Sequence, residues 1–102
     1  MTKQYKNIKT LENLILSDLK TENDIKDWLT VALEEYTEEN DFNSFYKALE
    51  YALKAKDSIS GISKKTGISR SNLYAIFKGE VQPQMSTVMK ILKELGYKLK
   101  VA

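Results

Sequence analysis

The stretch 58–79, SISGISKKTGISRSNLYAIFKG, constrains the fold more than any other part of the sequence. Its apolar spacing predicts two short helices joined by a tight turn. Ile59 and Ile62 share one face of the first helix, and Gly67 permits the left-handed backbone that the turn needs. Ile68 is expected to fill the corner between the helices. Because each helix has one apolar face, the pair must pack against further helices to bury it.

The second helix of this stretch has one apolar face and one polar face. Ser69 has the side chain of an N-cap, and Gly79 stands where a helix commonly ends. Leu73, Ile76 and Phe77 form the apolar face. The residues of the outward face are Arg70, Ser71, Asn72, Ala75 and Lys78. All of them except Ala75 are cations or carry hydrogen-bonding groups. Such a face suits the major groove of DNA, where the base edges present hydrogen-bonding groups.

Two helices are predicted before residue 40. Thr10 is expected to cap a helix through about Lys20, although the dense apolar run LENLILSDL also permits a short strand. Thr21 and Asp24 fit a capping box that begins a second helix, which continues through about Glu35. The residues expected to face the core are Leu11, Leu14, Ile15, Leu19, Ile25, Trp28, Leu29, Ala32, Leu33 and Tyr36. Trp28 is interpreted as an anchor between helices.

Residues 37–41 (TEEND) predict a polar loop, and Asp41 is expected to cap a helix over about 42–56. Ser86 is expected to cap the last helix, which Gly96 ends. Tyr97–Val101 alternates apolar and cationic residues, as a strand does, but it can equally be a tail. The expected core positions of these helices are Phe42, Phe45, Tyr46, Leu49, Ala52, Leu53, Val88, Ile91, Leu92 and Leu95.

These elements together predict an all-α fold, a compact bundle of about five to six helices. A short β-strand at the C-terminus is an alternative to a tail there. The 102 residues suffice for one domain with a single core. Within it we distinguish an N-terminal extension (1–23), an acidic helical pair (24–57), the helix-turn-helix part (58–96) and the C-terminal strand or tail (97–102).

The spacing in 58–79 resembles the helix-turn-helix of the Xre/lambda-repressor-like superfamily. The matching positions are Ile62, Ser63, Gly67, Ile68, Leu73 and Ile76. Residues 79–96 resemble the superfamily's next segment, where a Gly-x-x-x-Pro link leads into another helix. Ser63 stands where alanine is usual, so its hydroxyl must find a partner at the helix crossing.

More narrowly, the order of segments is similar to the addiction module antidote regulators of bacterial toxin–antitoxin pairs. The similar segments are 24–35, 45–56, 63–80 and 85–101. The resemblance implies a repressor that regulates its own operon, acts as a homodimer, and holds a small basic toxin of the RelE/ParE type. A stand-alone regulator of a phage or mobile element, without a toxin, is the alternative. A helical protein-interaction adaptor is another.

Composition removes most catalytic chemistry. The chain has no histidine and no cysteine, so imidazole bases, thiolate nucleophiles and nearly all zinc sites are excluded. Its four glycines are not clustered into a phosphate-cradling loop. We therefore expect no enzyme, no metal and no cofactor. No apolar run reaches the roughly 18–20 residues of a membrane span, and no signal-peptide core is present, so we expect a cytoplasmic protein with no membrane partner.

Charge is divided along the chain. Residues 1–57 carry eight lysines against twelve Asp and Glu, a net of −4, whereas 58–102 carry eight cations against two carboxylates, a net of +6. The basic part suits phosphates and the acidic part suits a basic protein. Within the acidic part, the exposed carboxylates Glu34, Glu35, Glu38 and Glu39 are the candidate toxin contacts, although an exposed acidic helix end is more often only a solvated surface.

The expected partner of the basic part is double-stranded DNA. Arg70, Ser71 and Asn72 lie in the first turn of the second helix, nearest the base edges. Arg70 suits guanine and Asn72 suits adenine, because each can make a two-bond contact with that base. Ala75 is small enough to approach a thymine methyl. The residues expected to contact the DNA backbone are Ser69, Tyr74, Lys78, Lys64 and Lys65.

One such helix pair covers only a few base pairs. Two copies placed about one DNA turn apart on a near-palindromic operator are therefore expected. The candidate surfaces for pairing are the apolar face of the last helix (Val88, Leu92, Leu95) and the segment Tyr97–Val101.

Overall fold

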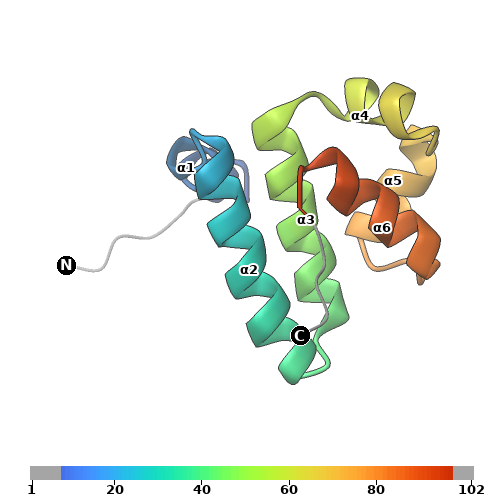
Figure 1. The fold of residues 1–102 in the computed structure, drawn as a ribbon, viewed down its shortest axis with the longest axis horizontal. Helices are drawn as coiled ribbons and strands as arrows, with labels where there is room; N and C mark the ends of the chain where they lie inside the picture. Colours follow the sequence, from blue (N-terminus) through green and yellow to red (C-terminus); the bar gives the residue numbers. More distant parts are fainter. Residues whose placement is uncertain (1–7, 98–102) are drawn as a thin grey trace.

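The computed structural model describes residues 8–97, with side chains from Leu11 onward. The described residues form six helices and no strand, which confirms the predicted all-α bundle (Figure 1). The helices are α1 (Ile8–Asp18), α2 (Glu22–Glu38), α3 (Phe42–Lys56), α4 (Ile59–Thr66), α5 (Arg70–Phe77) and α6 (Met85–Glu94). The predicted strand lies, apart from Tyr97, outside the described residues. No described helix is long and apolar enough to cross a bilayer.

Helix α3 is the centre of the bundle. The helices α1 and α2 pack on one side of it, and α4 and α5 pack on the other, with α6 resting on α4 (Figure 1). A surface helix buries one stripe, but α3 is buried on most of its circumference. Leu49, Ala52 and Leu53 are fully inaccessible. Both halves of the fold therefore depend on this one helix.

Trp28 joins α2 to α3, as predicted. Its indole Nε1 donates a hydrogen bond to the carbonyl oxygen of Ala48 at 2.9 Å. Its ring meets the Tyr51 ring edge-on, with centroids 6.2 Å apart. The side chain thus combines apolar contact area with a satisfied polar group.

The helix starts follow the predicted caps at three places, Thr21, Asp41 and Ser69, and Ser58 adds a fourth cap that was not predicted. Thr21 Oγ1 accepts from the Asp24 N–H, and Asp24 Oδ2 accepts from the Thr21 N–H, which completes the capping box of α2. The side chains of Asp41, Ser58 and Ser69 cap α3, α4 and α5 in the same way.

Two helix starts were predicted wrongly. Helix α1 begins at Ile8, before Thr10, and is a helix rather than the alternative strand. Helix α6 begins at Met85, and its N-cap is Gln84 without a side-chain hydrogen bond, so Ser86 does not cap it. The carbonyl oxygen of Gln84 accepts the N–H of Thr87, and this backbone contact, with the extended backbone of Gln84 itself, fixes the start.

Helix α2 is longer than predicted. It continues through Glu38, so the loop is shorter than 37–41. Nothing in the sequence breaks the helix before Asn40, whose φ of +59° turns the chain. The Asp41 N–H then bonds to the Tyr36 carbonyl oxygen at 2.7 Å. The carboxylates Glu34 to Glu38 therefore all project from a helix.

Three residues expected in the core are exposed. Leu11 and Leu14 lie 38% and 39% exposed because α1 packs mainly on α3, which covers a narrow stripe of it. Part of that stripe is polar, since Glu12 pairs with Lys54 of α3 at 2.6 Å. Phe42 is also exposed, at the first residue of α3.

We expect the replacement Leu49→Ala to lower the free energy of unfolding by about 2–5 kcal/mol, since the side chain is fully buried in the central helix. The matched control Val31→Ala truncates an exposed apolar side chain of α2 and should change it by less than about 0.5 kcal/mol. Urea denaturation followed by helical circular dichroism measures both. Equal effects of the two replacements would contradict the assignment of α3 as the core helix.

The capping box predicts a pH dependence. The Thr21 N–H bond, together with the Lys20 N–H, lowers the pKa of Asp24 below its ordinary value of 3.8. This carboxylate therefore stabilises the fold at neutral pH, and its contribution disappears as the pH falls through the lowered pKa. We expect Asp24→Asn to lower the thermal midpoint at pH 7, and the difference from wild type to shrink below about pH 4. A difference that is the same at pH 7 and at pH 2.5 would argue against this role.

Candidate nucleic-acid interface

The pair α4 and α5 is held by hydrogen bonds within its own turn. Gly67 ends α4 with a φ of +77°, in the left-handed region that favours glycine, and its N–H bonds to the Ser63 carbonyl oxygen. The Thr66 hydroxyl donates to the Ile62 carbonyl oxygen at 2.7 Å and accepts from the Ile68 N–H at 3.2 Å. This role of Thr66 was not predicted from the sequence, although a threonine directly before a turn glycine is a signal for it.

The apolar positions predicted to face inward are all buried, which confirms this part of the sequence analysis. They are Ile59, Ile62, Ile68, Leu73, Ile76 and Phe77. The pair is anchored on α3 through both helices, and α6 packs on α4. The α5–α6 loop is tied to α3 as well, because the Tyr46 hydroxyl donates to Gln82 Oε1 at 3.2 Å. The backbone of α5 is therefore held on a rigid support.

The first turn of α5 presents its polar residues to solvent. Arg70, Ser71 and Asn72 are exposed, and the Ser69 hydroxyl accepts the Asn72 N–H at 3.1 Å. Arg70 makes no ion pair with any residue that the structure describes. Its guanidinium is available for an external acceptor. The turn thus offers one cation, one amide and one hydroxyl side by side.

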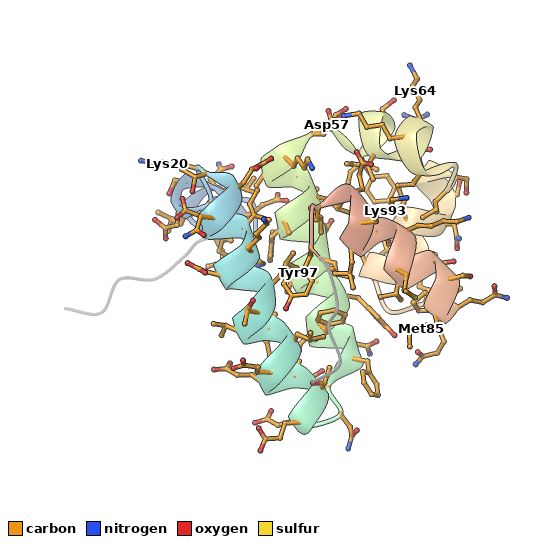
Figure 2. The ribbon with its side chains drawn as sticks, in the orientation of Figure 1. Lys20, Asp57, Lys64, Met85, Lys93 and Tyr97 are labelled. Carbon is orange, nitrogen blue, oxygen red and sulfur yellow. The ribbon has the colours of Figure 1, made fainter. Side chains whose placement is uncertain are left out.

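The residues predicted to contact the DNA backbone divide into exposed side chains without an ion pair in the part of the chain that the structure describes and Lys65, which is paired. Tyr74, Lys78 and Lys64 are exposed, and neither lysine makes an ion pair within residues 11–97. Figure 2 shows Lys64 projecting from α4 into solvent, with Lys20 on the far side of α3.

Ala75, which was predicted to approach a thymine methyl, is half-buried. It therefore offers only part of its side chain for that contact.

Lys65 differs from the other lysines. Its Nζ lies 3.0 Å from Asp57 Oδ2 and 3.9 Å from Glu94 Oε1. The hydrogen bond from Lys65 lowers the pKa of Asp57, and the same bond raises the pKa of Lys65. Both groups therefore stay charged at neutral pH, and Lys65 holds α4 against α6 rather than projecting freely.

Gly61 leaves room for the Asp57 carboxylate of this ion pair. A Cβ atom at Gly61 would lie 2.5 Å from Asp57 Oδ2, so a larger residue there would make the carboxylate shift. Asp57 also accepts the Ser58 N–H at 2.7 Å, at the start of α4. The sequence did not reveal this arrangement, because it joins the turn before α4 with α4 itself and with the end of α6.

The acidic residues lie on the other side of α3. Glu34, Glu35, Glu38 and Glu39 are all exposed at the end of α2, which packs on α3 and not on α4 or α5. The cations of α4 and α5 and these carboxylates therefore belong to helices on opposite sides of α3 (Figure 1).

An apolar groove of about 230 Å³ lies between α2, α3 and α6. Phe42, Met85 and Val88 line part of it, and Met85 is 70% exposed. Leu92 and Leu95, which were expected in the core and also named as candidates for pairing between copies, are buried within the subunit. The outer surface of α6 offers Met85 and Met89 instead.

Comparison with known proteins gives one family and one relative. Residues 9–102 match the family model described as "Probable addiction module antidote protein". An uncharacterized protein of Haemophilus influenzae is 31% identical over 101 residues, which cover 99% of this chain and 94% of the relative. No solved structure matches the chain significantly. The family model covers nearly the whole chain, so this protein belongs to the family of probable addiction module antidote proteins.

Proposed function

We propose that this chain is the antidote of a toxin–antitoxin module and represses its own operon by binding DNA through α4 and α5. One observation supports DNA binding most strongly: Arg70, Ser71 and Asn72 are exposed together on the first turn of a helix whose other face is fully buried. That arrangement and its spacing are similar to an Xre-like helix-turn-helix. Family membership supports the antidote role over that of a stand-alone regulator.

In the proposed complex the first turn of α5 enters the major groove. Arg70 bonds to guanine O6 and N7, and Asn72 bonds to adenine N6 and N7, each contact discriminating by about 1–3 kcal/mol. Lys64, Lys78 and Tyr74 bind phosphates and fix the register of the protein on the duplex. Lys65 contributes through its ion pairs, which hold α4 in place.

The proposed active species on DNA is a homodimer. One α5 helix reaches only a few base pairs, whereas two copies on a near-palindrome double the contacts and define the half-site spacing. The exposed methionines of α6, Met85 and Met89, are apolar and accessible for such pairing. Leu92 and Leu95 are not, because the core already covers them.

The antidote role requires a toxin as second partner. The family description supports its existence, and a basic toxin of the RelE/ParE type is the class we propose. Because α2 packs on α3 opposite α5, the acidic side of the bundle stays accessible when α5 lies in a groove. The protein can therefore hold DNA and toxin at the same time.

Replacement of Arg70 and Asn72 by alanine tests the base contacts. We expect the double variant to bind a labelled fragment of its own promoter at least about 10-fold more weakly, since each lost contact is worth about 1–3 kcal/mol. The control Lys20→Ala removes an exposed cation near the start of α2 and should leave the affinity unchanged. Fluorescence anisotropy against scrambled DNA of equal length measures the specific part. Wild-type affinity of the double variant would refute the assignment of α5.

Loss of a phosphate-binding lysine should change DNA affinity in a different way from loss of a base contact. Lys64→Ala and Lys78→Ala should each weaken binding to promoter and scrambled DNA alike, and each should reduce the slope of log affinity against log salt by about 1. The same anisotropy titration at several salt concentrations gives this slope. If either variant lost only the preference for the promoter, its lysine would be a base contact instead.

A further inference from the structure

We propose that the outward face of α2, centred on Val31, is the docking surface for the toxin, and that the segment it binds is basic with an apolar side chain at its centre. The inference rests on the proposed antidote function and adds to it the surface and the chemistry of the partner. We call this surface the Val31 face. It consists of Asp27, Trp28, Val31, Glu34, Glu35 and Glu38.

The Val31 face has an apolar centre. Val31 is 52% exposed, although it lies in the middle of a helix and makes no contribution to the buried core. Beside it is a small hollow lined by Trp28, Ala32, Tyr36 and Ala48. The half-buried Trp28 and Tyr36 rings thus extend the apolar area from Val31 towards α3. This hollow can receive an apolar side chain of a partner.

Carboxylates surround this apolar centre. Counted from Val31, Asp27 stands four residues before, and Glu34, Glu35 and Glu38 stand three, four and seven residues after, so all share its side of the helix. All four are exposed, and none makes an ion pair within the described part of the chain. One of them, Asp27, accepts a hydrogen bond of 3.4 Å from the side-chain amide of Asn23.

The arrangement is unfavourable in the isolated protein. Glu34 and Glu38 are like charges at the i, i+4 spacing, which destabilises a helix. They also lie near the C-terminal end of α2, where the helix dipole is negative, and the last turn has no basic residue. A cationic partner removes both costs on binding. The charges therefore fit a bound state better than the free one.

The same charges exclude other occupants. DNA phosphates would be repelled by four carboxylates, and a second copy would bring the same four against them. A basic protein segment is attracted, and its lysine or arginine side chains can pair with the carboxylates while its apolar side chain covers Val31. Since the Val31 face lies on the helix opposite α5, binding there does not compete with DNA.

The test uses the protein encoded by the gene adjacent to that of this chain, titrated into the full-length antidote by isothermal titration calorimetry. We expect Val31→Arg, and separately Glu34→Gln with Glu38→Gln, to weaken this complex at least about 10-fold. The free variants should unfold at the same or a higher temperature than wild type, because each change relieves the clustered negative charge. The control Glu22→Gln removes an exposed carboxylate from the first turn of the same helix and should leave the affinity unchanged.

The results distinguish a wrong docking surface from a wrong antidote function. If the wild-type chain binds the adjacent product and the Val31 and Glu34/Glu38 variants bind equally well, the Val31 face is not the docking surface, while the antidote function stands. If the wild-type chain does not bind the adjacent product, the antidote function itself is overturned. Promoter binding measured with the same variants should match wild type, and a loss there would place the Val31 face in DNA binding instead.

Discussion

The burial of α3 on most of its circumference is the constraint on which the rest of the structure depends. Leu49, Ala52 and Leu53 are inaccessible because other helices cover α3 on opposite sides. One charged residue, Glu50, is buried with them, and it is paired with Lys47 at 2.8 Å and Lys54 at 3.1 Å. Loss of packing along this helix would therefore release both halves of the bundle together.

The central helix also separates two surfaces of opposite charge. Helices α4 and α5, which carry the cations, lie on one side of α3, and α2, which carries the carboxylates, lies on the other (Figure 1). Each surface carries exposed groups without ion pairs among the described residues, such as Arg70 on one side and Glu38 on the other. Charges left unpaired in this way fit external partners, and their separation by α3 agrees with our proposal that the chain holds DNA and a toxin at the same time.

Features set by neighbours in the sequence were predictable, and those set by tertiary packing were not. The Thr21 capping box and the Gly67 turn were predicted correctly, because a cap or a left-handed residue acts within four positions. The exposure of Leu11, Leu14 and Phe42 depends on how the helices pack, and all three were wrongly predicted to lie in the core. In the candidate interface, the exposed turn at Arg70 could be predicted from spacing, but the ion pairs of Lys65 could not, because Glu94 comes from α6 and Asp57 from the turn before α4, beyond the i, i+4 spacing of helix neighbours.

The central claim is that α5 reads DNA while α2 remains outside that interface. The most direct measurement is an NMR titration of the isotope-labelled protein with a duplex of its own promoter, in which amide shifts report the contact surface. The account predicts the largest shifts over Ser69–Lys78 and near Lys64, with α2 unaffected. Shifts concentrated on α2, or no specific shifts at any residue, would contradict it.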